Sequence, residues 1–361
     1  MSNFDSNYWY SFPAVRGMQA GRPFYIATCP MRIIPKIFSF DETDVPPELR
    51  AQRTLNKTRI PEMVRYLLEN PNDYVFSALT ASIAVDVQFD EFSNSNNLGT
   101  LRVPMDAQIL INDGQHRRKA IEDALAERPE LGQDNIPVLF FVDEGLRRSQ
   151  QMFADLNKYA IRPSPSLSAL YDHRDVSSNL ARYLAMTIEP FKGLTELEKS
   201  SISTLSNKLF TLSSIKQATR ALLGKEPKMG DIDESTNIAA VYWQAVFEVM
   251  PDWQLAARKE VSPAQLRQDY VHAHGIGLQA LGLLGRTLLT EEPEAWQKKI
   301  AKLKTFDWRK SNPEMVKRAM QHGKLSKTGV AIQLTCNALK HALSIPLTPE
   351  EQAYEAQMVV S

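Results

Sequence analysis

The residues best suited to chemistry lie where a short apolar segment runs through an Asp-Gly turn into a basic helix start. From residue 109 to 120 the sequence reads Ile-Leu-Ile-Asn-Asp-Gly-Gln-His-Arg-Arg-Lys-Ala. Asp113 is suited to cap the helix, and Gly114 lets the backbone approach a ligand. Free N–H groups in a first helical turn attract phosphate, and the basic residues that follow add full charges. The pattern predicts a phosphate-binding turn; the alternative is a plain strand–turn–helix junction with solvated basic residues.

Titratable residues near this turn allow a second interpretation, in which the turn is catalytic. His116 is placed to act as a general base or a metal ligand, with Asp113 orienting it or binding Mg²⁺. Asp155 and Asn157 follow a predicted buried strand and could complete a polar cleft at the turn. The catalytic candidates are then Asp113, His116 and Asp155, and the cofactor would be a nucleotide or Mg²⁺. The phosphate- or nucleotide-binding candidates are Asp113, Gly114, Gln115, His116, Arg117, Arg118 and Asn157.

Three other segments accompany the Asp-Gly-Gln-His-Arg motif. They are Arg-Ile-Pro-Glu-Met-Val-Arg-Tyr-Leu-Leu-Glu-Asn at 59–70, Met-Phe-Ala-Asp-Leu-Asn-Lys-Tyr-Ala at 152–160 and Asp-Trp-Arg-Lys-Ser-Asn-Pro at 307–313. Together they resemble the DGQHR-domain family and, within it, the DndB family of DNA sulfur modification proteins. The resemblance implies a ParB/sulfiredoxin-like fold whose equivalent turn cradles a nucleotide or DNA phosphate. The Glu-Asn pair typical of ParB proper is replaced here by Asp155-Leu156-Asn157, so CTP-driven clamping is not carried over.

Composition limits the class of protein. The chain has 361 residues, with 42 basic and 42 acidic side chains, so any affinity for nucleic acid must come from local patches. The length favours about two domains. The sequence contains no apolar run long enough for a membrane span and no secretory leader, so we expect a cytoplasmic, nucleoid-associated protein. Two cysteines cannot supply a four-ligand zinc site by themselves, and we expect reduced thiols and no structural metal.

The residue pattern predicts an α+β domain of mixed sheet and helices over residues 1–162, followed by an all-α domain over 163–361. Prolines at 163 and 165 mark the boundary. Expected strands in the first domain are 24–34, interrupted at Pro30, 74–87, 101–103, 107–111 and 136–142, with a loop at 90–99. Expected helices are 61–68, 116–127, 237–249, 270–289 and 330–343.

The second domain contains a strongly basic segment. Residues 298–327 contain ten basic and two acidic side chains, an excess of eight positive charges. Such an excess suits contact with a phosphate backbone, whereas the alternative is a solvated basic face on a helical bundle. Predicted helices at 313–321 and 330–343, joined by 322–329, could form a helix-turn-helix. The DNA-binding candidates are Arg117, Arg118, Lys119, Arg309, Lys310, Lys317, Arg318, Lys324 and Lys327.

Cys29 is a candidate redox-sensitive residue. It follows an apolar run and precedes Arg32, a cation that would favour the thiolate. The alternative is a small buried residue on a strand.

These observations favour a sequence-selective duplex DNA binder, and the resemblance makes it the repressor of a bacterial DNA phosphorothioation operon. Its partners would be its own operon promoter, a second copy of itself on paired half-sites, and other DNA sulfur modification proteins. One alternative is a ParB-like nucleotide hydrolase or metal-dependent DNA nicking enzyme in the same system. A third interpretation is a scaffold for the modification enzymes.

Overall fold

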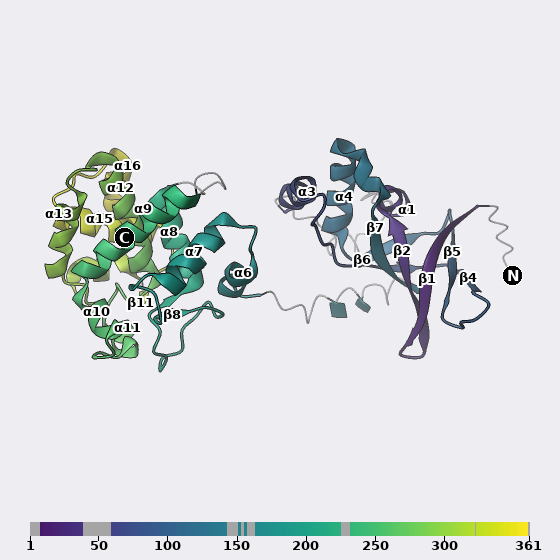
Figure 1. Ribbon diagram of the computed structural model, residues 1–361, viewed down its shortest axis with the longest axis horizontal. Coiled ribbons are helices and arrows are strands. Elements are labelled where there is room, and N and C mark those ends of the chain that lie inside the picture. The colour runs from purple at the N-terminus through teal and green to yellow at the C-terminus, as the bar shows by residue number, and fades with distance from the viewer. Residues whose placement is uncertain are drawn as a thin grey trace. The chain divides into compact units, whose positions relative to one another are not determined.

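The computed structural model describes residues 8–38, 59–142, 151–152, 155–156, 163–224, 232–321 and 323–359. Internal contacts divide the chain into two compact units, Met1–Ile161 and Arg162–Ser361. We call them the N-terminal unit and the helical unit; their elements are labelled in Figure 1. The N-terminal unit combines a mixed sheet with helices, and the helical unit consists mainly of helices.

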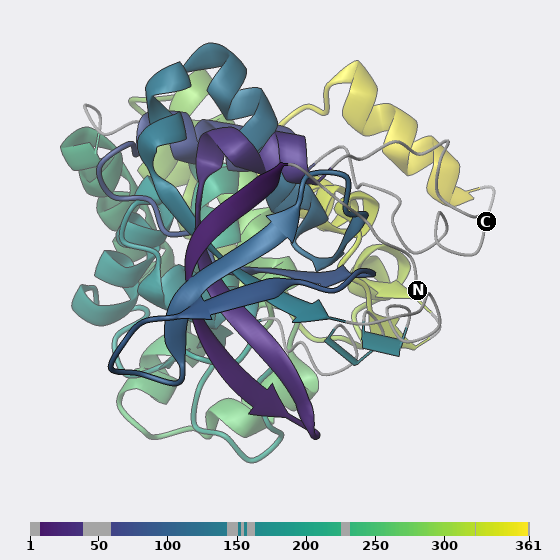
Figure 2. The same ribbon diagram turned by 90° about the vertical axis from the view of Figure 1, so that its right-hand side faces the viewer.

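A seven-stranded sheet forms the framework of the N-terminal unit. Its strands are β1 Trp9–Gln19, β2 Arg22–Pro30, β3 Leu79–Ile83, β4 Gln88–Glu91, β5 Leu98–Pro104, β6 Ile109–Asp113 and β7 Asn135–Val142. Their spatial order is β4-β5-β1-β2-β7-β3-β6. The pairing of β3 with β7 is parallel and the other pairings are antiparallel, so the sheet is mixed. Figure 2 shows the twist of these strands.

The hairpin of β1 and β2 is closed by a two-residue turn. Ala20 and Gly21 both have positive φ, 50° and 73°, as the primed turns that match strand twist require. β1 was not predicted from the sequence. The predicted strand over 24–34 is correct as far as Pro30, where β2 ends, and wrong beyond it. Residues 31–33 form a short 3-10 helix, η1 Met31–Ile33, and Ile34 begins an α-helix.

Helices cover one face of this sheet, as both views show (Figures 1 and 2). They are α1 Ile34–Ile37, α3 Ile60–Glu69 and α4 Gln115–Glu127, with η2 Pro129–Gln133 after α4. Alternate residues of the strands face them; in β7 these are Ile136, Val138 and Phe140, all buried. The predicted helices at 61–68 and 116–127 and the predicted strand at 136–142 are confirmed within two residues.

The predicted strand over 74–87 is wrong over most of its length. Only Leu79–Ile83 joins the sheet there. The backbone N–H of Val75 donates instead to the Tyr66 hydroxyl (2.8 Å), whose ring stacks on Phe76. Because these contacts bind the segment to α3, its backbone does not continue a strand. The predicted loop at 90–99 is shorter, since β4 extends to Glu91 and β5 starts at Leu98.

The helical unit is organised around α12. Its elements are α6 Pro165–Tyr171, α7 Val176–Thr187, β8 Thr195–Glu196, β9 Phe210–Thr211, α8 Leu212–Leu223, α9 Ile232–Val249, α10 Pro251–Ala257, α11 Pro263–Asp269, α12 Gly275–Glu291, α13 Trp296–Ile300, η4 Ala301–Thr305, α14 Pro313–Ala319, β10 Met320–Gln321, β11 Lys324–Leu325, α15 Gly329–Ala342 and α16 Pro349–Val359. α12 packs against α8 and α15. Among the described residues, none of the helices combines the length and the apolar character that a membrane crossing requires.

Candidate nucleic-acid interface

The Asp113 turn is built on a glycine that no other residue could replace without strain. β6 ends at Asp113, α4 begins at Gln115, and Gly114 between them has φ +107°. A Cβ on Gly114 would collide with the Leu79 side chain and lie 3.1 Å from Nη2 of Arg117. The predicted capping role of Asp113 is wrong, because Gly114 is the N-cap residue and no side chain caps α4. The Asp113 carboxylate instead accepts a hydrogen bond from Arg117 (2.7 Å).

Arg117 is the organising side chain of the turn. Its Nη2 donates to Asp113, its Nη1 donates to the Ser77 hydroxyl, and its buried Nε has no hydrogen-bond partner among the described residues. Burial lowers the pKa of His116, and the positive charges of Arg59 and Arg117 lower it further. The turn therefore brings the guanidinium groups of Arg59 and Arg117 close to His116, with the Asp113 carboxylate paired to Arg117. Arg59 lies in the quoted 59–70 segment, but Ser77 carried no signal in the sequence.

Arg118 and Lys119 form their hydrogen bonds and ion pairs within the N-terminal unit. Arg118 is buried, with Nε donating to the Phe38 carbonyl (3.0 Å) and Nη2 to the Pro35 carbonyl (3.1 Å). Its Nη1 pairs with Glu122 (2.7 Å). Lys119 donates to the carboxylates of Asp123 and Glu122, and these hydrogen bonds raise its pKa. The structure therefore gives Arg118 a structural role in place of the predicted phosphate and DNA contact.

The structure describes some of the other residues proposed for a catalytic cleft. Gln115 Nε2 donates to the Ile111 carbonyl (3.1 Å), so this amide belongs to the turn itself. Asp155 is exposed and accepts a hydrogen bond from Gln151 (2.7 Å). Asn157 lies outside the described residues. Within the described part of the chain, no group of three or more His, Cys, Asp or Glu side chains is arranged to hold a metal ion.

The basic segment at 298–327 keeps much of its charge exposed. Four of its cations are engaged: Lys299 pairs with Glu292, Arg309 with Asp307, Arg318 with Glu314 and Glu355, and Lys310 donates to the Arg267 carbonyl. The remaining six are exposed lysines that form no ion pair with the described residues; they are Lys298, Lys302, Lys304, Lys317, Lys324 and Lys327. We call them the exposed lysine set. Arg318 does not belong to this set because it is buried, as Arg118 is in the N-terminal unit.

The predicted helix-turn-helix is not supported. The connection between α14 and α15 contains a two-stranded hairpin, β10–β11. A recognition helix must present one face to a DNA groove. In α15 the buried residues are Ala331, Leu334, Thr335, Cys336, Asn337, Ala338, Leu339 and Lys340, which leaves no continuous exposed face in its middle. α15 is a core helix of the bundle.

Cys29 is a core residue. It lies on β2, is fully buried, and burial raises its pKa to about 12. The Arg32 guanidinium is directed elsewhere, to the Gln133 side chain (2.9 Å) and the Gly132 carbonyl (3.3 Å). The expected thiolate is therefore wrong, and the alternative of a small buried strand residue describes Cys29.

Neighbouring basic residues of α4 should respond differently to mutation. Arg118→Met should lower the free energy of unfolding by about 2–4 kcal/mol, because it leaves the buried Phe38 carbonyl and the half-buried Pro35 carbonyl without donors. Lys119→Met should change it by less than about 0.5 kcal/mol, since its ion pairs are partly exposed. Urea unfolding of both variants measures the difference. Equal, small effects would contradict the structural role of Arg118.

Cys29→Ser should act through stability. A hydroxyl placed in this apolar core should cost about 1–3 kcal/mol of unfolding free energy, which thermal or urea unfolding would measure. In the folded wild type, both Cys29 and Cys336 should react with a thiol reagent only as fast as the protein opens, because both are buried. Rapid modification of Cys29 without loss of structure would restore the redox interpretation.

Comparison with known proteins agrees with the motifs described above. The family model DndB, described as DNA-sulfur modification-associated, matches residues 12–346. No curated protein and no solved structure matches the chain. The family match spans both units and includes the Asp113 turn and the basic segment. The chain therefore belongs to the DndB family of DNA-sulfur modification-associated proteins.

Proposed function

We propose that this protein is a DNA-binding transcriptional regulator that represses the operon of a bacterial DNA sulfur modification system. The observation that carries the proposal is the exposed lysine set: six cations within 30 residues that form no ion pair with the described residues, in a chain whose net charge is zero. Each lysine that meets a phosphate releases condensed counterions, which drives association with duplex DNA. Membership of a DNA-sulfur modification-associated family supplies the biological context.

The Asp113 turn would add one phosphate contact in this proposal. Arg117 and Arg59 bring positive charge to the turn, and Gly114 keeps its backbone free of a side chain. In the same proposal the N-terminal unit adopts a ParB/sulfiredoxin-like fold, and the protein binds paired half-sites in the cytoplasm as a homo-oligomer. Other DNA sulfur modification proteins are further partners.

A mobility-shift titration in EDTA tests the function. Duplex DNA from the protein's own upstream promoter should bind more tightly than a scrambled duplex, and affinity should fall steeply with salt. The slope of log affinity against log salt should approach about −5 if all six lysines contact phosphates. Equal, weak binding to both duplexes would contradict the repressor. Binding or strand cleavage that appears only with a divalent metal would favour the enzyme alternative.

Neutralising members of the exposed lysine set tests which surface binds. Lys304→Gln and Lys317→Gln should each weaken binding about three- to tenfold near 0.1 M salt and make the salt slope shallower by about one. Lys192→Gln is the matched control, because Lys192 is also exposed in the helical unit but lies outside the segment. If the three variants behave alike, the segment is not the DNA surface.

A further inference from the structure

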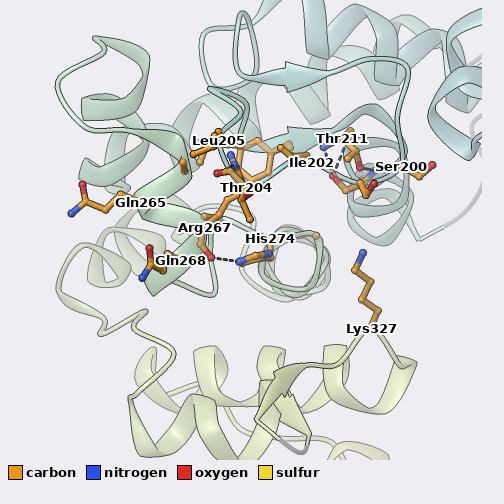
Figure 3. A pocket seen from close by; sticks show the side chains of 17 residues that line it. Ser200, Ile202, Thr204, Leu205, Thr211, Gln265, Arg267, Gln268, His274 and Lys327 are labelled. Atoms are coloured by element: carbon orange, nitrogen blue, oxygen red, sulfur yellow. Dashed lines mark hydrogen bonds between the residues drawn. The ribbon is translucent and has the colours of Figure 1, made fainter.

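The helical unit contains a pocket of about 650 Å³ whose lining includes Lys327 of the exposed lysine set (Figure 3). It lies between the 200–211 segment, α11, the start of α12 and the loop before α15. Its volume falls within the range of sites for small organic ligands. Apolar side chains form part of its lining, namely Ile202, Leu205, Leu209, Phe210, Ala264 and Ala273.

Arg267 builds one wall of this pocket. Its guanidinium donates to the carbonyls of Ser203 (2.8 Å), Thr204 (3.0 Å), Ser206 (3.0 Å) and Lys208. These bonds hold an irregular loop in one shape although it contains little regular structure. The cavity is thereby preformed, so a ligand would not have to order its wall.

Charge in the pocket is one-sided. None of the described residues that line it is acidic, whereas Arg267 and Lys327 are cationic. His274 donates from Nε2 to the Arg267 carbonyl (2.6 Å), which leaves Nδ1 as an acceptor. Burial lowers the pKa of His274 to about 4, and the charges of Lys310, Arg267 and Lys327 add to that shift. The field at His274 is therefore positive while the imidazole stays neutral.

Two positively charged features of the pocket have no side-chain partner among the described residues. No side chain caps the N-terminus of α12, which starts at Gly275 in the pocket lining. Figure 3 shows the Lys327 side chain extending from the loop before α15 toward the opposite wall. A helix of 17 residues presents positive partial charge at its N-terminus, and Lys327 adds a full charge beside it.

We propose that this pocket binds a small organic anion, with its carboxylate or phosphate at the α12 N-terminus near Lys327 and its apolar body against the Ile202–Phe210 side. The positive charge of the pocket attracts the anionic group, and the apolar side chains bury the apolar body. Neither part of the ligand alone should therefore bind well. Lys327 belongs both to this pocket and to the exposed lysine set, so the ligand is tested in the absence of DNA.

Fluorescence titration of the full-length protein with naphthalene probes tests the proposal, without DNA. 2-Naphthoate and 2-naphthyl phosphate should bind saturably, and their relative affinity distinguishes a carboxylate ligand from a phosphate ligand. The neutral 2-naphthalenemethanol, and inorganic phosphate as a competitor, should each bind at least about tenfold more weakly. Equal affinity of the neutral and anionic probes, or no saturable binding of either anion, would overturn the proposal.

Variants locate the binding event. Lys327→Gln should weaken anionic probes about three- to tenfold without affecting the neutral probe, whereas Lys302→Gln, a matched exposed lysine outside the pocket, should change neither. Ala264→Phe should block all probes by filling the cavity, with its unfolding midpoint confirming that the variant folds. Anion binding that survives both Lys327→Gln and folded Ala264→Phe would place the site elsewhere.

Discussion

Two glycines of α12 allow the close helix packing on which the helical unit depends. A Cβ at Gly282 would collide with the Ala218 carbonyl of α8, and one at Gly285 would collide with the Tyr242 ring of α9. With the glycines in place, Tyr242 donates to the Leu281 carbonyl (2.5 Å). This packing fixes α12, whose N-terminus enters the pocket and whose flank supports α15. η4, which carries Lys302 and Lys304, and α14, which carries Lys317, pack in turn against α15.

The protein separates charges that hold the fold from charges that face solvent. Arg118 and Arg318 are buried and bonded to carbonyls or carboxylates, so their removal would leave buried polar groups unpaired. The lysines of the exposed lysine set form no ion pair with the described residues. Buried Arg118 and Arg318 thus stabilise the fold. Only the exposed lysines would add to the proposed long-range attraction for DNA.

Sequence patterns predicted elements whose burial follows a simple period. The helices at 61–68, 237–249 and 330–343 were anticipated because apolar residues recur at helical spacing. The 74–87 segment was not, since apolar content cannot show whether a backbone N–H meets a strand or the Tyr66 hydroxyl. The burial of a single side chain cannot be predicted from its type either. Of the three consecutive basic residues at 117–119, only Arg118 is buried.

The site was anticipated to a similar extent. The motif located the Asp113 turn and its need for glycine, but a sequence cannot reveal that Arg117 bonds Asp113 and Ser77, which come from separate parts of the fold. The pocket in the helical unit could not be predicted from the sequence either, because its residues are far apart along the chain. Its lining joins residues 200–214, 264–275 and 327, and no local spacing connects them.

Lysine acetylation footprinting of the full-length protein, free and bound to its upstream promoter duplex, most directly tests the claim that the exposed lysine set forms the DNA surface. Quantitative mass spectrometry would follow each lysine at limiting reagent. The account predicts that DNA slows acetylation across the exposed lysine set while Lys192 and Lys119 react as in the free protein. Unchanged reactivity of that set in a saturated complex would contradict it.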